Sequence, residues 1–168
     1  MPEPLQPEEL FATLARHHVD YVLIGGLAAT LHGSSALTND ADICPDASPA
    51  NLERLAAALR DMDARVRTQT EPEGVPFSAD GDLLARMNLM TLTTRFGDFD
   101  IAFRPAGSRG YDDLAPGASA VDIDGTVVRV ASLDDIIHSK EVANRPKDRA
   151  TLPILYALQD EIARDAGG

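Results

Sequence analysis

Two aspartates, Asp40 and Asp42, are separated by one residue at the start of an apolar segment that predicts a β-strand over Ala41–Cys44. On a strand, residues two apart project from the same face, about 6–7 Å from each other. Two carboxylates placed in this way can bind a hard divalent cation such as Mg²⁺, which prefers oxygen ligands. Taken alone, the pair is more typical of two solvated acids at the end of a strand, because surface acids are common.

A third acid on a neighbouring strand would complete such a metal site. Asp100 lies between Phe99 and Ile101, where apolar residues alternate with others in the pattern of a strand with one buried face. Asp98 shares a face with Asp100 and is the alternative third ligand. We favour Asp100, because it lies inside the alternating run.

A glycine pair precedes the two aspartates. The apolar residues Tyr21–Ile24 predict a buried strand, and Gly25 and Gly26 interrupt it before a short helix expected over Leu27–His32. Glycines at such a turn allow backbone N–H groups to approach a phosphate, and a helix N-terminus favours an anion. A plain strand–helix turn has the same pattern, so the glycines gain significance only together with the downstream acids.

These residues must be positioned by an α/β (α+β) fold, because the predicted elements alternate between helices and strands before ending in two helices. We expect a mixed β-sheet flanked by helices, with the helices on one side. The helices are expected from Pro7, from Pro49, from the Ser132–Asp135 capping pattern to about Val142, and over Lys147–Ala163. The remaining strands are expected over Arg65–Thr68, Asn88–Arg95 and Phe99–Phe103, and in a hairpin over 121–130, with loops over 69–82 and 105–118.

Composition restricts the partners of this chain. Its 168 residues carry 15 basic and 27 acidic side chains, for a formal net charge of −12, and we expect one domain over residues 1–168. The acidity argues against a broad nucleic-acid surface or an anionic membrane, but leaves room for a local phosphate site. The longest apolar run, Tyr21–Leu31, is too short to span a membrane, and the single Cys44 suits a reducing cytoplasm.

The lysines of the chain lie near its C-terminus. The only two lysines are Lys140 and Lys147, and Arg145 lies between them. A solvated helix face would account for this grouping, and so would a group of positive charges directed at a bound phosphate.

The order of these features resembles the nucleotidyltransferase superfamily with the polymerase-beta-like fold. The resemblance rests on Ile24–Gly33 followed by Thr38-Asn-Asp40-Ala-Asp42-Ile43, and more loosely on the segment around Asp100. It is closest to the AbiEii/MenT branch of nucleotidyltransferase toxins, in which a Lys, an Arg and a Lys-Asp pair recur beyond the sheet. Here the segment Lys140–Asp148 has that pattern, on C-terminal helices expected to pack on the core over about 132–165.

The resemblance implies transfer of a nucleoside monophosphate from an NTP to a hydroxyl acceptor, with one or two Mg²⁺ ions as cofactor. Asp40, Asp42 and Asp100 would be both the catalytic residues and the metal ligands. The implied nucleotide-binding residues are Gly25, Gly26, Thr38, Lys140, Arg145, Lys147 and Asp148. The acceptor would be an RNA such as tRNA, or a protein, with an antitoxin protein as a further partner.

Two alternatives stay open. The first is transfer to a small molecule of the aminoglycoside type, since an acidic pocket suits a cationic substrate. The second is a catalytically inactive binding or regulatory protein with the same fold. It is motivated by Ala36 and Asn39, which occupy positions where relatives often carry Arg and Lys.

Overall fold

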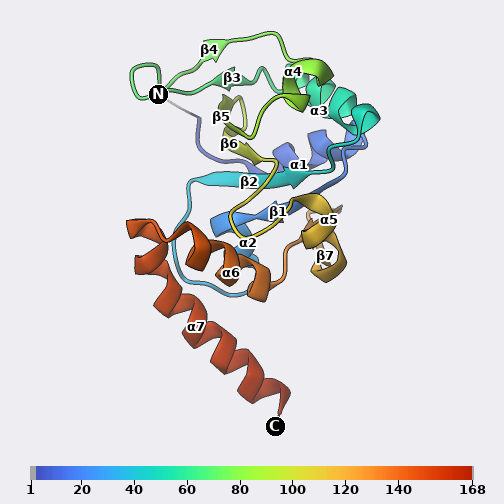
Figure 1. The fold of residues 1–168 in the computed structure, drawn as a ribbon. Coiled ribbons are helices and arrows are strands. Elements are labelled where there is room, and N and C mark those ends of the chain that lie inside the picture. Colours follow the sequence, from blue (N-terminus) through green and yellow to red (C-terminus); the bar gives the residue numbers. More distant parts are fainter. Residues whose placement is uncertain (1–2, 168) are drawn as a thin grey trace.

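One mixed β-sheet of eight strands organises residues 3–167, the part of the chain that the computed structural model describes (Figure 1). The strand order is β4-β3-β5-β6-β2-β1-β8-β7. The strands are β1 Tyr21–Ile24, β2 Asp40–Pro45, β3 Arg65–Val66, β4 Val75–Pro76, β5 Leu89–Thr94, β6 Gly97–Ala102, β7 Ser119–Ile123 and β8 Thr126–Val130. The helices are α1 Pro7–Arg16, α2 Gly25–Leu31, α3 Pro49–Asp61, α4 Gly81–Ala85, α5 Tyr111–Leu114, the 3₁₀ turn Ala115–Gly117, α6 Leu133–Ala143 and α7 Pro146–Ala166. The predicted α/β class with a mixed sheet is confirmed.

The centre of the sheet is formed by strands that come from distant parts of the sequence. β2 pairs antiparallel with β1 on one side and parallel with β6 on the other, and β1 pairs parallel with β8. The pleat of β2 separates its side chains, because successive residues point to opposite faces. Ala41 and Ile43 are fully buried, whereas Asp40 and Asp42 are only partly buried on the other face.

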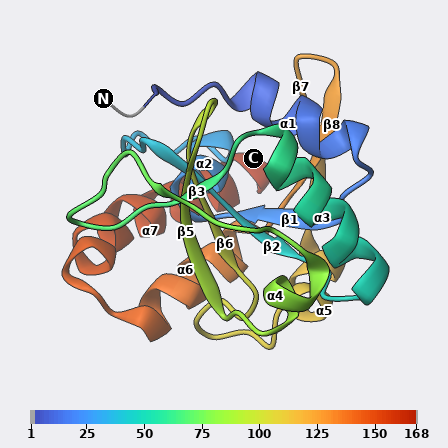
Figure 2. The ribbon, with the colours of Figure 1, turned by 90° about the horizontal axis from the view of Figure 1, so that it is seen from above.

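Helices cover both faces of the sheet, which corrects the expectation that they lie on one side. Figure 2 shows α1 and α3 on one side of the strands and α6 and α7 on the other. The face toward α1 and α3 holds much of the apolar core, including the fully buried Leu10 and Phe11 of α1 and Leu55 of α3. The opposite face of the sheet, which carries Asp40 and Asp42 and is called the aspartate face below, is therefore the side on which α2 and the C-terminal helices lie.

Several expected elements have the local causes that the sequence suggested. The hydroxyl of Ser132 accepts a hydrogen bond from the backbone N–H of Asp135 at 3.0 Å and begins α6. At the tip of the β7–β8 hairpin, Asp124 and Gly125 have φ of 50° and 87°, the values expected of a type I′ turn. Asn144, with φ of 51°, ends α6 in the left-handed conformation and turns the chain into α7.

The structure departs from the sequence-based boundaries in a few places. Helix α2 starts at Gly25 rather than Leu27, so the glycines form its first turn. The expected loop over 69–82 contains β4 and the start of α4, which Asp80 caps by accepting a hydrogen bond from the N–H of Leu83 at 2.7 Å. Elements this short carry little periodicity, so their pattern does not stand out from a loop.

The last helix extends beyond the rest of the molecule. Helix α7 begins beside α6, and its C-terminal half projects away from the sheet (Figure 1). Pro153 lies inside the helix without ending it. Within residues 3–167, no helix has both the length and the apolar character required to cross a bilayer.

Candidate metal and nucleotide site

Parallel pairing of β2 with β6 sets the central acidic residues beside one another. In the register of these strands, Asp42 stands opposite Asp100, and Asp40 stands opposite Asp98. Residues directly opposite in a sheet project from the same face, so all four carboxylates lie on the aspartate face.

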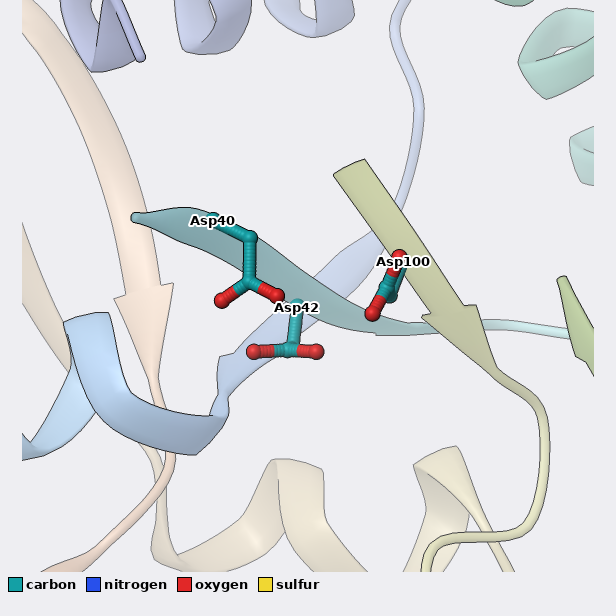
Figure 3. Close-up of side chains that lie close together, drawn as sticks. All are labelled: Asp40, Asp42 and Asp100. Carbon is teal, nitrogen blue, oxygen red and sulfur yellow. The ribbon is translucent and has the colours of Figure 1, made fainter. Parts of the chain in front are cut away.

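Three of these carboxylates converge. One oxygen from each of Asp40, Asp42 and Asp100 lies within 4.8 Å of the others. Figure 3 shows the three side chains projecting from β2 and β6 to the same side, with the Asp100 carboxylate turned toward Asp42. The structure thus brings together the residues that the sequence analysis proposed as metal ligands. Asp98, the alternative third ligand, is not in this group and forms a different contact, described below.

The local environment opposes ionisation of the cluster. Burial raises the pKa of Asp42 from an ordinary value of 3.8 to about 7, and the neighbouring charges of Asp40 and Asp100 add to the effect. Burial, and then the charge of Asp40, raises the pKa of Asp100 to about 6, although Arg67 acts to lower it. Carboxylates this close repel one another, and a bound cation or a proton is needed to offset the repulsion.

The donor set fits a magnesium-like cation. All the grouped ligand atoms are carboxylate oxygens, the ligands that Mg²⁺ prefers over nitrogen or sulfur. Two oxygens across one Mg²⁺ ion stand about 4.2 Å apart, so carboxylates within 4.8 Å of one another need only small side-chain rotations to share an ion. Asp40, Asp42 and Asp100 are the residues that would hold it.

The two glycines allow α2 to approach β2 closely. Gly25 has φ of 74°, and a Cβ added there would collide with the Asp42 carboxylate. A Cβ at Gly26 would lie 3.0 Å from the Cβ of Thr38. The hydroxyl of Thr38 in turn donates to a carboxylate oxygen of Asp40 at 3.1 Å. These three residues therefore set the position of the metal-site carboxylates, and phosphate binding by the glycines stays a prediction.

The C-terminal helices bring the two lysines to the acidic cluster. Lys147 and Lys140 both act to lower the pKa of Asp42, which places their positive charges near that carboxylate. Lys140 comes from the end of α6 and Lys147 from the first turn of α7. Basic residues far apart in sequence from Asp42 thus contribute to the same site.

Asp148 contacts two of the basic residues on the C-terminal helices, Arg145 and Lys140. Its side chain is fully buried and accepts hydrogen bonds from the backbone N–H and the Nε of Arg145, at 3.0 and 2.7 Å. The Lys140 Nζ lies 3.7 Å from its other oxygen. Burial acts to raise the pKa of Asp148, but the hydrogen bonds and charges of Arg145 and the charge of Lys140 prevail and lower it. Arg145 and Asp148 therefore position Lys140, and direct contact of either with a nucleotide stays a prediction.

One residue of the site, Arg67, was not expected from the sequence. Arg67 follows β3, and its guanidinium lies between Asp100, at 3.1 Å from Nη2, and Asp98, at 3.5 Å from Nε. Nothing in the sequence indicated that β3 joins the sheet beside β5. The alternation of Arg65 and Arg67 with Val66 on a predicted strand was the one available signal that both arginines share a face.

Comparisons with known proteins support the fold class. No protein-family model and no curated protein sequence matches the chain. Among solved structures, the fold is similar to the lincosamide antibiotic adenylyltransferase LnuA bound to lincomycin, with a TM-score of 0.59 and 15% identity over 93% of this chain and 99% of the other. It is also similar to a candidate nucleotidyltransferase from Thermotoga maritima, with a TM-score of 0.53 and 16% identity over 90% and 94% of the two chains. The chain therefore has the fold seen in nucleotidyltransferases.

Proposed function

We propose that this protein is a Mg²⁺-dependent nucleotidyltransferase, which moves a nucleoside monophosphate from an NTP to a hydroxyl acceptor and releases pyrophosphate. The observation that carries the proposal is the convergence of Asp40, Asp42 and Asp100 within 4.8 Å, together with Lys140 and Lys147 near Asp42. Nucleotidyl transfer depends mainly on positioning and charge neutralisation, which is what such a set of residues provides.

Each part of the site has a role in this proposal. Asp40, Asp42 and Asp100 would hold Mg²⁺, which would offset the negative charge that develops during transfer. Lys140 and Lys147 bind the triphosphate as point charges, and Arg145 offers a planar partner for a phosphate. Asp100 accepts the proton of the acceptor hydroxyl. A new bond forms between that oxygen and the α-phosphorus, while the bond from the α-phosphorus to pyrophosphate breaks.

We infer a small hydroxyl compound as the acceptor. LnuA is a lincosamide adenylyltransferase, and its fold is matched over 99% of its length by this chain. The net charge of −12 also disfavours a long anionic acceptor and favours a cationic one. The second candidate is an RNA such as tRNA, or a protein, as in a cytoplasmic toxin–antitoxin pair; the basic residues between Lys140 and Arg149 would then guide a phosphate backbone.

The test is a label-transfer assay. The protein is incubated with Mg²⁺ and each of four α-labelled NTPs, against a panel of lincosamides and aminoglycosides, total tRNA and lysate proteins. We expect label on a small-molecule acceptor in the unchanged protein and in Asp160→Asn, a control at an exposed position of α7, and none in Asp42→Asn. Full transfer by a well-folded Asp42→Asn protein would contradict the mechanism.

A binding measurement tests the alternative of an inactive protein. With Ala36 and Asn39, the loop before β2 has no Lys or Arg, so the positive charge of the site has to come from the C-terminal helices and Arg67. If calorimetry with Mg²⁺ detects binding of none of the four NTPs, the protein is a binding partner with a nucleotidyltransferase fold.

A further inference from the structure

Arg67 contacts the third metal-site carboxylate and is not one of the residues expected from the sequence. Its Nη2 donates to Asp100 at 3.1 Å, while its Nε faces Asp98 at 3.5 Å. The side chains of Arg67, Asp98 and Asp100 are exposed by only 26%, 21% and 19%. The ion pairs therefore lie in a partly shielded region, where charges act more strongly than at an open surface.

The arrangement leaves hydrogen-bonding capacity unused. The Nε of Arg67 and the Oδ1 of Asp98 are both buried without a hydrogen-bond partner. A guanidinium and a carboxylate are shaped to form two parallel hydrogen bonds with each other. Arg67 and Asp98 do not form such a pair here, because the guanidinium is shared with Asp100.

We propose that Arg67 is a positioning residue with two alternative partners. Its guanidinium pairs with Asp100 when no metal is bound there, and it pairs with Asp98 when Asp100 binds metal. With no cation bound, the guanidinium neutralises the carboxylate that lies nearest to it. Metal binding at Asp100 competes with this contact, and Asp98 offers Arg67 an alternative partner on the same strand and face. In this proposal Asp98 binds the guanidinium of Arg67 and is not a metal ligand.

The proposal predicts opposite effects for the two members of the pair. Removing the guanidinium with Arg67→Gln takes away both a competitor and a nearby positive charge, so divalent-metal affinity should rise. Removing the Asp98 charge with Asp98→Asn leaves Arg67 to pair with Asp100 alone, so metal affinity should fall. A side chain that merely supported the fold would lower affinity in both variants.

The inference rests on the proposed function only in requiring that the three carboxylates hold a divalent ion, and the test measures binding apart from transfer. Mn²⁺ and Mg²⁺ are titrated by calorimetry into the unchanged protein and the variants, without nucleotide and at about pH 8.5, above the pKa of Asp42. We expect affinity to rise about three- to tenfold in Arg67→Gln and to fall by a similar factor in Asp98→Asn. Both changes should shrink as salt is added.

Arg65→Gln is the matched control. Arg65 lies two residues earlier, in β3, and its guanidinium pairs with the exposed Asp63 at 3.5 Å. We expect its metal affinity to stay within about twofold of the unchanged protein. Thermal melts accompany each titration, so that a fold defect is separated from a change in binding.

The outcomes distinguish the two ideas. A fall in affinity in both Arg67→Gln and Asp98→Asn, or no change in either, overturns the role of Arg67 while leaving the proposed function in place. Absence of both metal binding and label transfer in the unchanged, folded protein overturns the proposed function and this inference with it.

Discussion

Replacing Asp42 with asparagine should stabilise the metal-free protein while abolishing its activity. Burial and two neighbouring carboxylates raise the pKa of Asp42 from 3.8 to about 7, so the folded state resists the charge that the unfolded state accepts. The difference corresponds to roughly 4 kcal/mol. Because Asp42 keeps partial contact with solvent, we expect screening to reduce this gain to about 2–3 kcal/mol.

The pH dependence follows from the direction of the shift. Well below its ordinary pKa of 3.8, Asp42 is protonated in both the folded and the unfolded chain and does not affect stability. As the pH rises from about 4 to about 7, only the unfolded chain ionises, so the folded state loses stability. The advantage of Asp42→Asn should therefore be about 1 kcal/mol at pH 5 and complete above about pH 8.

The measurement is urea unfolding of both proteins at pH 5 and pH 8.5, with and without Mg²⁺. Added Mg²⁺ should stabilise the unchanged protein at the higher pH, because binding to the folded state alone shifts the equilibrium, and should have little effect on Asp42→Asn. Asp160→Asn, at an exposed position of α7, should change stability by less than about 0.5 kcal/mol. If Asp42→Asn were less stable than the unchanged protein at pH 8.5, the electrostatic reasoning would be refuted.

Three further predictions address other parts of the site. Gly25→Ala should cost about 2–4 kcal/mol and reduce transfer strongly, whereas Gly125→Ala, with a similar positive φ but open space around the added Cβ, should cost only about 1 kcal/mol; equal costs would mean that backbone strain alone matters. Asp148→Asn should destabilise by about 2–4 kcal/mol and raise KM for the NTP, while Asp113→Asn, in an exposed pair, should stay within about 1 kcal/mol in thermal melts. Lys147→Met should raise KM for the NTP about tenfold or more in steady-state kinetics and leave the melting temperature nearly unchanged; an unaltered KM would remove Lys147 from the nucleotide site.

Much of the fold was predictable because its main elements have strong local signals. The apolar runs of β1 and β2, the alternation in β6 and the Asp124-Gly125 turn each define an element from a few consecutive residues. Short elements such as α4 and β4 were missed, because two to five residues carry no measurable period. The placement of helices on both faces also depends on chain direction between elements, which local patterns do not encode.

The candidate site also contains residues that local sequence predicts and one that it does not. Asp40 and Asp42 were predictable, because their spacing places them together whatever the strand pairs with. The choice of Asp100 over Asp98 concerned two residues on one face. The structure separates them, because Asp100 lies in the cluster with Asp40 and Asp42 and Asp98 does not. Arg67 itself could not be predicted, because its position depends on the pairing of β3 with β5.

The parallel pairing of β2 with β6 has a consequence for the order of folding. Asp42 and Asp100 face each other across nearly 60 residues of intervening chain, which includes α3 and the β5–β6 hairpin. Contacts of such large sequence separation form slowly, since the loop between them must close first. The antiparallel hairpin and the helices can therefore form before the carboxylates meet, and their mutual repulsion enters only when β6 docks. A divalent ion that offsets this repulsion would then speed the docking of β6 and leave the earlier steps unchanged.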